Sequence, residues 1–228
     1  MQALVHTPTP SLETSIEFYE NLGFHRIPHK QMTLVGDAKT RIEINPSRTA
    51  RAGIKLINKS WSHEIQQLKK IVPIHPLKDG YALADPSNCW IYLIESDEEL
   101  PALTVANTSI LGNYMGLSLE SSNIELSIKI YEALGLAQSM GSLEQGWLTL
   151  QHPNGFGLSL MKPNSCPHLF FNPSLTFFNG EKNLSVIAEL RNKNIAFTEE
   201  ITVFNEEGIV DNVIIRDPGG YGFFIFSD

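Results

Sequence analysis

The sequence contains little that would support a disulfide framework or a membrane span. Only two of its 228 residues are cysteines, Cys89 and Cys166, and they form neither a disulfide pattern nor a metal-ligand spacing. No stretch approaches the roughly 18 consecutive apolar residues that indicate a membrane helix. The N-terminus also lacks the basic segment and apolar run of a signal peptide. These absences predict a reduced, cytoplasmic protein that does not associate with membranes.

Positive charge is also scarce. The 17 Lys and Arg residues are outnumbered by 25 Asp and Glu residues, which gives a net charge of −8. Nucleic-acid binding requires clustered basic side chains, so we expect no nucleic-acid partner. Four basic residues do gather between positions 39 and 51, but such a group is more typical of a solvated hairpin edge than of an anion site. They are Lys39, Arg41, Arg48 and Arg51.

The motifs of common hydrolases are missing as well. The sequence has no Gly-x-Ser-x-Gly elbow and no His-Glu-x-x-His helix. The spacing of the seven histidines singles out none as a general base. Cys166 and His168 are close in sequence, but Pro167 between them favours a loop over a catalytic dyad. The sequence therefore identifies no catalytic residue, and whether the protein is an enzyme stays open, with a binding protein favoured.

What the sequence does contain is a duplication. Segment 11–24 reads SLETSIEFYENLGF, and segment 123–136 reads NIELSIKIYEALGL. The offset between them is constant, since 127 − 15 = 112 and 131 − 19 = 112. Asp85-Pro86 and Asp217-Pro218 form a second matched pair, and each precedes an aromatic-rich run. Matched motifs repeated in the same order indicate two copies of one unit.

The pattern of hydrophobic residues predicts the elements of each copy. Leu12, Ile16 and Tyr19 recur at helical spacing, with an N-cap residue at Ser11 and a glycine after the last turn. Short alternating or β-branched runs separated by turn residues predict strands before and after each helix. The expected helices lie at 11–22, 61–72, 123–134 and around 187–190. The expected strands lie at 2–7, 32–35, 41–45, 54–57, 81–84, 90–94, 114–120, 147–151, 157–161, 175–178, 213–216 and 223–226.

This order predicts an α+β protein built from four βαβββ units. We expect the units to pair into two tandem domains, at 1–97 and 110–228, joined by a linker at 98–109 that contains an acidic run and Pro101. Each domain then has a size near the lower end of the usual range. Because tandem domains can pair within one chain, a monomer is plausible, and a homodimer remains the alternative.

The helix motif and the Asp-Pro turn resemble those of the vicinal oxygen chelate superfamily, which includes glyoxalases, bleomycin-resistance proteins and extradiol dioxygenases. The first half carries the resemblance at Ser15, Tyr19, Gly23, Asp85 and Pro86, and the second half repeats it. The segment 45–51, NPSRTAR, is also similar to a junction of the CppA family, two-domain proteins of this fold that are described as complement-degrading proteinases. These motifs specify a fold better than a function.

The resemblance implies a metal site in each domain, with one ligand from the first and last strand of each unit. Counting from the motifs places eight residues at these positions: Leu4, Glu43, Gly53 and Tyr92, then Gly116, Ser159, Leu175 and Phe224. On this alignment only Glu43 is a competent ligand, whereas a zinc ion needs about three protein donors. The sequence therefore predicts that the family's metal site is lost and that the protein carries no metal or other cofactor.

A displaced polar site in the first domain is the remaining candidate. His6 lies two residues beyond Leu4 on the same strand face and would join Glu43 and Tyr92. The alternative is that His6 is a strand-end residue that is hydrogen-bonded or exposed to water. We predict ligand binding by His6, Glu43 and Tyr92, and a small apolar or aromatic molecule as the ligand, because aromatic residues could line the sheets. Those aromatic residues could equally be core. A CppA-type proteinase and a metal-dependent lyase or dioxygenase are the alternatives.

Overall fold

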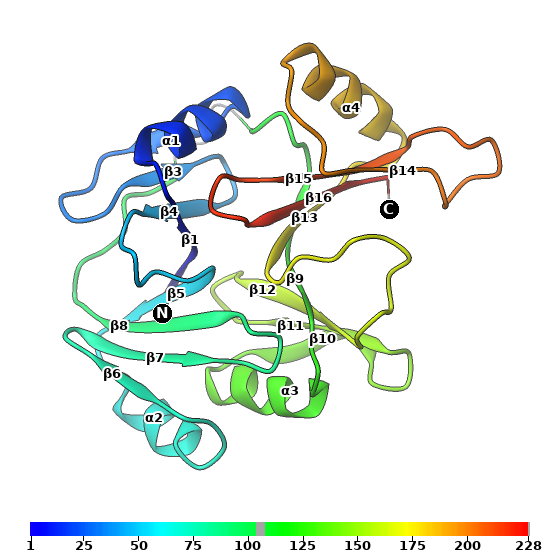
Figure 1. The fold of residues 1–228 in the computed structure, drawn as a ribbon. Coiled ribbons are helices and arrows are strands. Elements are labelled where there is room, and N and C mark those ends of the chain that lie inside the picture. The colour runs from blue at the N-terminus through cyan, green and yellow to red at the C-terminus, as the bar shows by residue number, and fades with distance from the viewer. Residues whose placement is uncertain (104–107, 228) are drawn as a thin grey trace.

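The computed structural model describes residues 1–103 and 108–227, and these residues form two eight-stranded mixed sheets (Figure 1). The first sheet has the strand order β2-β3-β4-β1-β5-β8-β7-β6, and the second has β10-β11-β12-β9-β13-β16-β15-β14. No helix in this described part is long and apolar enough to cross a membrane.

The elements follow the same order in each half. The first half contains β1 (Gln2–Pro8), α1 (Leu12–Asn21), β2 (His25–Ile27), β3 (Leu34–Gly36), β4 (Arg41–Asn45), β5 (Gly53–Asn58), α2 (Ser62–Leu68), β6 (His75–Leu77), β7 (Gly80–Ala84) and β8 (Trp90–Glu95). The second half contains β9 (Tyr114–Glu120), α3 (Ile124–Ala133), β10 (Ala137–Ser142), β11 (Trp147–Gln151), β12 (Gly157–Met161), β13 (Ser174–Phe178), the 3-10 helix η1 (Gly180–Lys182), α4 (Asn183–Asn192), β14 (Glu199–Ile201), β15 (Asn212–Arg216) and β16 (Gly222–Phe226).

The predicted α+β fold of four βαβββ units is confirmed. Within each sheet the two units meet at their first strands, because β1 pairs antiparallel with β5 and β9 with β13. The strands that were not predicted are β2, β6, β10 and β14, at the sheet edges. Three of them have only three residues, and β6 and β10 are largely exposed, so they lack the hydrophobic pattern that predicts a strand. Helix α2 is shorter than predicted and ends at Leu68.

Local chemistry explains why the duplicated segments form helices. The Ser11 side chain accepts a hydrogen bond from the Thr14 backbone N–H, and the Asn123 side chain accepts one from the Leu126 N–H. These N-caps satisfy donors that have no partner within the helix. After each helix the chain reverses at Gly23 and Gly135, whose φ angles of +88° and +87° disfavour other residues.

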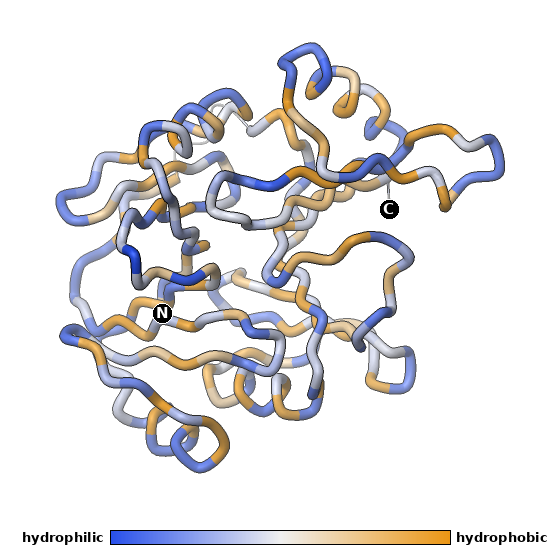
Figure 2. Tube along the Cα trace, viewed as in Figure 1, coloured by the Kyte–Doolittle hydropathy of each residue, from blue (hydrophilic) through white to orange (hydrophobic). Residues whose placement is uncertain are grey.

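The two domains share one hydrophobic core, which extends from Val5 in β1 to Ile225 in β16. The buried strands are largely hydrophobic, and hydrophilic residues concentrate at peripheral loops (Figure 2). Matched buried polar contacts cross between the domains. Asp217 in the β15–β16 turn accepts hydrogen bonds from Thr7 (2.6 Å) and Tyr19 (2.8 Å), and Asp85 in the β7–β8 turn accepts one from Ser127 (3.1 Å). Both repeated Asp-Pro motifs therefore bind the opposite domain.

The predicted linker includes residues 104–107, which lie outside the described residues, as does residue 228 of the predicted second domain. The described residues around this segment contact the first sheet. Leu100 is buried with Leu4 and Leu34, and its backbone N–H donates to the Gln2 side chain. The Pro101 carbonyl accepts hydrogen bonds from Arg41. Residues 100 and 101 therefore pack against the sheet instead of forming a free tether.

Candidate functional site

Four polar side chains converge in the first domain, one from each central strand of the sheet. His6 of β1 lies opposite Glu43 of β4, and Lys55 of β5 lies opposite Tyr92 of β8. The internal repeat relates these two pairs, since 6 + 49 = 55 and 43 + 49 = 92. His6 also lies opposite Gly53, which is two residues before Lys55 on β5. Paired residues, and residues two apart on one strand, point to the same face of a sheet, so all four side chains face the same side.

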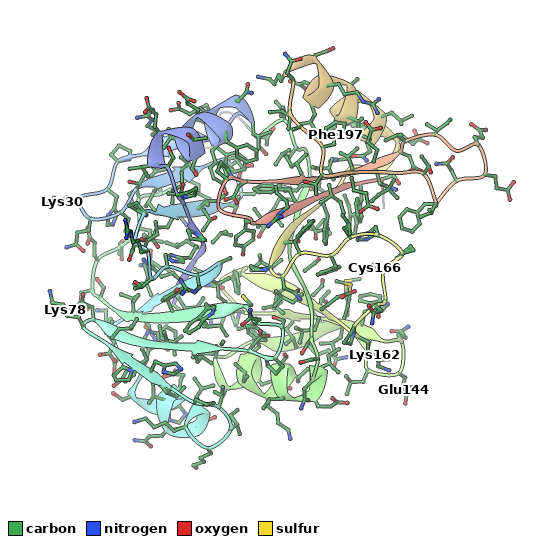
Figure 3. The ribbon with its side chains drawn as sticks, viewed as in Figure 1. Lys30, Lys78, Glu144, Lys162, Cys166 and Phe197 are labelled. Atoms are coloured by element: carbon green, nitrogen blue, oxygen red, sulfur yellow. The ribbon has the colours of Figure 1, made fainter. Side chains whose placement is uncertain are left out.

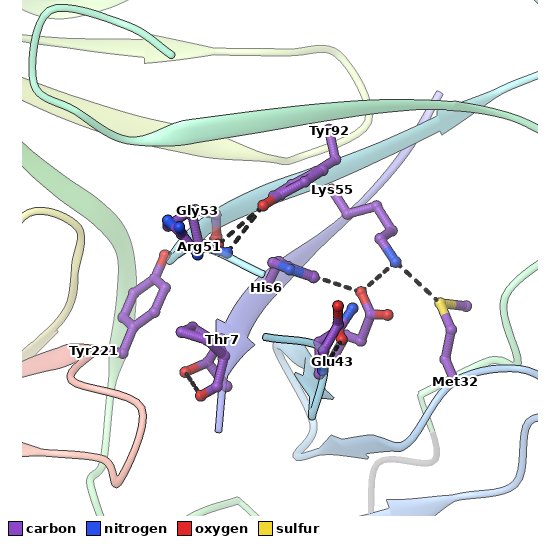
Figure 4. Close-up of polar contacts among 12 residues, drawn as sticks. His6, Thr7, Met32, Glu43, Arg51, Gly53, Lys55, Tyr92 and Tyr221 are labelled. Atoms are coloured by element: carbon purple, nitrogen blue, oxygen red, sulfur yellow. Dashed lines mark hydrogen bonds and ion pairs between the residues drawn. The ribbon is translucent and has the colours of Figure 1, made fainter. Parts of the chain in front are cut away.

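Glu43 is the centre of this group (Figure 4). Its Oε2 lies 2.7 Å from His6 Nδ1 and also forms an ion pair with Lys55 Nζ. The His6 ring lies against Tyr92, with 4.4 Å between ring centroids. The Tyr92 hydroxyl accepts a hydrogen bond of 3.0 Å from the Arg51 backbone N–H. Glu43, Lys55 and the Tyr92 hydroxyl therefore already have hydrogen-bond or ion-pair partners within the protein.

The electrostatics of the group keep Glu43 ionised. Burial is the largest single influence on this carboxyl and opposes ionisation, but hydrogen bonds and charge from His6 and Lys55 outweigh it and lower the pKa of Glu43. A carboxylate can only accept hydrogen bonds, so the proton between Glu43 and His6 belongs to Nδ1 of the imidazole. The opposite ring nitrogen, Nε2, is buried and has no hydrogen-bond partner among the described residues.

The predicted ligand-binding residues His6, Glu43 and Tyr92 are thus brought together, but two of them are closed off from solvent. His6 is 1% exposed and Glu43 is 4% exposed. The concave face beside them is filled by an apolar cluster that includes Leu4, Leu34 and Leu100. Their predicted role in ligand binding stays a prediction.

The strand register adds two residues to the positions that the sequence count selects. On β1, His6 and not Leu4 lies opposite Glu43. On β5, Lys55 and not Gly53 lies opposite Tyr92. A side chain at Gly53 would collide with the Trp90 backbone, which explains the glycine without a role in binding. Lys55 was missed because lysine is not a metal ligand, although the repeat offset of 49 points to it.

The equivalent positions of the second domain are Ser118, Ser159, Thr176 and Phe224. Ser118 pairs with Ser159, and Thr176 pairs with Phe224. The Ser118 and Thr176 hydroxyls lie 2.6 Å apart and share a hydrogen bond. The ligand positions counted from the sequence motifs include Gly116, which lies two residues before Ser118. They also include Leu175, which lies one residue before Thr176 and belongs to the core on the opposite face of the sheet.

Aromatic side chains fill one half of the second concave face. Phe224 packs against Phe170 at 4.9 Å between ring centroids, and His168 lies edge-on to Phe224 at 5.2 Å. Two other aromatic residues of this sheet, Phe177 and Phe223, are both in the core. On this half of the sheet, around β16, aromatic rings therefore pack against Phe224.

The other half of the second sheet borders a cavity of about 760 Å³. Its floor includes Gly116, Thr149 and Ser159 from β9, β11 and β12. Lys39 and Arg41, from the β3–β4 hairpin of the first domain, also line it. This volume is in the range of small-molecule binding sites. The cavity lies between the domains, and the sequence reasoning, which placed a ligand in the first domain, did not find it.

The cysteine and the histidine that are close in sequence, Cys166 and His168, have different contacts. Cys166 lies on the segment after β12 (Figure 3), where its Sγ is 3.9 Å from Met161 Sδ. The His168 ring nitrogen Nδ1 is 2.8 Å from the Leu169 carbonyl. Burial raises the pKa of Cys166 to about 11. A thiol with this pKa is a weak nucleophile at neutral pH.

Within residues 1–103 and 108–227, no three His, Cys, Asp or Glu side chains form a group that could hold a metal ion. The first-domain set has only two residues of these types, His6 and Glu43, with a phenol and an ammonium group completing it.

Solved structures share this architecture. The 2,3-dioxygenase LapB from Pseudomonas sp. KL28 is 16% identical and has a TM-score of 0.56, with 97% of this chain and 90% of LapB covered. The Mn(II)-bound glyoxalase from Novosphingobium aromaticivorans is 13% identical, with a TM-score of 0.58 and coverage of 97% and 79%. Homoprotocatechuate 2,3-dioxygenase from Brevibacterium fuscum is 13% identical, with a TM-score of 0.59 and coverage of 99% and 70%.

These likenesses establish the fold, which is that of the vicinal oxygen chelate proteins. No protein-family model matches the sequence, and no curated protein does. At identities of 11–16% the comparisons carry the fold alone and not the activity. None of them supports the narrower resemblance to the CppA family.

Proposed function

We propose that this chain is a small-molecule-binding protein of the vicinal oxygen chelate fold that works without a divalent metal. The observation that carries the proposal is the ion pair of Lys55 with Glu43, at the centre of the first-domain polar set. The resemblance to this fold implies that the four equivalent strands would supply the ligands of a metal ion. Here one of the four positions holds an ammonium group, which donates hydrogen bonds and has no lone pair for a metal.

The donor set does not fit a divalent ion. Glu43 is occupied by Lys55 and His6, and the Tyr92 hydroxyl is hydrogen-bonded to the Arg51 backbone. A positive ion would also lie next to the Lys55 charge in a buried environment, where like charges repel strongly. We infer that Lys55 supplies the positive charge that a metal ion would otherwise give to Glu43.

The cavity of about 760 Å³ between the domains supports the binding role, since small-molecule pockets combine apolar walls with a few polar groups. Met115 and Met140 line the cavity and are 58% and 63% exposed, and Thr149 and Ser159 provide hydroxyls. The ligand-binding set predicted from sequence, His6, Glu43 and Tyr92, is the competing location.

Two measurements test the proposal. First, elemental analysis of the purified, dialysed protein is expected to find no stoichiometric divalent metal. Lys55→His should create a His–His–Glu donor set and bind added Zn²⁺ more tightly than wild type. About one equivalent of metal in the wild type, lost in Glu43→Gln, would overturn the metal-free reading.

Second, a thermal-shift screen of small aromatic and carbonyl compounds is expected to give hits. A ligand at 100 times its Kd adds about 2.7 kcal/mol to stability, which is easily measured. Ser159→Trp should fill the cavity and abolish these hits, and His6→Ala should leave them. Hits that are lost only in His6→Ala would place the site in the first domain, as the sequence predicted. A screen without hits would count against a binding function.

The fold leaves a metal-dependent lyase or dioxygenase as the second candidate, favoured by the convergence of His6, Glu43 and Tyr92 from three central strands. The metal analysis separates it from the first candidate. The CppA-type proteinase has no such support from side-chain geometry, and its test is cleavage of unstructured casein that persists through a second purification step.

A further inference from the structure

The cavity between the domains is unusual in its charge. The protein has 25 acidic and 17 basic residues, yet the residues that line this cavity include two basic side chains and no carboxylate. The two basic side chains, Lys39 and Arg41, come from the first domain, and residues of the second domain line the same cavity. A cavity whose charge has the opposite sign to that of the whole protein attracts ligands that the remaining surface repels.

Neither basic side chain has an acidic partner in the described part of the chain. None of the ion pairs among the described residues involves Lys39 or Arg41. Lys39 Nζ donates a 2.6 Å hydrogen bond to the neutral amide of Asn113. Arg41 donates from Nε and Nη2 to the Pro101 carbonyl, at 3.1 and 2.9 Å, which leaves Nη1 without a partner among the described residues.

The position of Arg41 is also fixed. Two hydrogen bonds to one carbonyl oxygen orient its guanidinium plane, so little side-chain entropy remains to be lost when an anion binds. The group is partly buried, and this burial lowers the pKa of Arg41 from its ordinary value. A partly desolvated, positioned guanidinium is a strong donor for carboxylate or sulfonate oxygens.

The rest of the lining indicates what the ligand body looks like. Met115 and Met140 are exposed thioether side chains, which adapt to irregular apolar shapes. Thr149 and Ser159 add hydroxyls without charge. The lining thus combines two cationic side chains with flexible apolar ones.

We propose that the cavity binds small organic anions, with Arg41 holding the acidic group and the methionine-lined wall holding an apolar body. This inference rests on the proposed binding function and adds the class of ligand. It also assigns a role to the first domain, since residues 1–5 and the β3–β4 hairpin line the site together with the second domain. Lys39 contributes a second positive charge at the same edge.

The test compares two fluorescent probes of the same shape. 8-Anilinonaphthalene-1-sulfonate carries a sulfonate, and N-phenyl-1-naphthylamine has the same aromatic body without it. We expect the wild type to bind the sulfonate probe more tightly. Arg41→Gln should weaken that probe about tenfold or more, in line with hydrogen bonds to charged groups, and should leave the neutral probe unchanged. Arg41→Lys should retain part of the affinity, and Arg48→Gln, which changes an exposed arginine outside the cavity lining, serves as the matched control.

The outcomes separate the two proposals. If Ser159→Trp removes binding of both probes and Arg41→Gln affects only the anion, both proposals are supported. Equal binding of both probes, lost in Ser159→Trp but unaffected by Arg41→Gln, would keep the cavity and refute the preference for anions. Binding of neither probe, or binding unaffected by Ser159→Trp, would refute the use of this cavity. If Arg41→Gln lowers the Tm strongly, the affinity for the sulfonate probe is measured instead in Lys39→Gln and at increasing salt concentration. An affinity that changes with neither would refute the inference.

Discussion

Removing the Lys55 ammonium should expose how much the first-domain polar set depends on it. Its side chain is 12% exposed, and that of its partner Glu43 is 6% exposed. Breaking a pair this buried typically costs about 3–5 kcal/mol, because the remaining charge has lost its partner. We expect Lys55→Met to lose about 3 kcal/mol, near the lower limit, because His6 still donates to Glu43.

The assay is urea unfolding at neutral pH, followed by tryptophan fluorescence. For a chain of this length the loss corresponds to a Tm decrease of about 6–12 °C, at roughly 2–4 °C per kcal/mol. Lys59→Met is the matched control, since Lys59 pairs with Asp97 at side-chain exposures of 83% and 84%. An exposed pair contributes about 0–1 kcal/mol. Replacing both members, with Lys55→Met and Glu43→Leu together, should recover much of the loss because no charge is left unpaired.

The effect also has a predicted pH dependence. The folded-state pKa of Glu43 is lowered, so its contribution to stability is present above the unfolded pKa of about 4.3 and is lost as the pH falls through the folded value. The difference between wild type and Lys55→Met should therefore shrink in acid. If Lys55→Met costs no more than Lys59→Met, or if the difference does not change with pH, the reasoning about a buried charge pair is wrong.

Three further predictions concern the domain contact and the proteinase alternative. Burial raises the pKa of Asp217, so the folded state holds a proton on this carboxyl between about pH 3.9 and the raised value, and stability declines as the pH rises through that window. Asp217→Asn should remove this decline. Parallel Tm–pH profiles of variant and wild type would contradict this. Gly219→Ala should lower the Tm, since a Cβ there would collide with the Pro8 carbonyl of the other domain, and an unchanged Tm would show that the turn can move away. The purified protein should not cleave casein; cleavage that survives repurification and is lost in Cys166→Ala would refute this.

The sequence by itself determined the architecture. A duplication with a constant offset, capped helices and Asp-Pro turns are local signals, and the structure reproduces them as two sheets of paired units. The helix ends were predictable because Ser11 and Asn123 bond within their own first turns.

The tertiary structure decided the site. Strand register depends on partners that are distant in sequence, so counting from a motif does not show that His6, two residues beyond Leu4, lies opposite Glu43. Whether a concave face is open depends on segments that fold over it, as Leu100 does on the first sheet and Phe170 on the second. Arg41 appeared in the sequence as part of a solvated basic group. Its place at a cavity between the domains follows only from how the two sheets pack together.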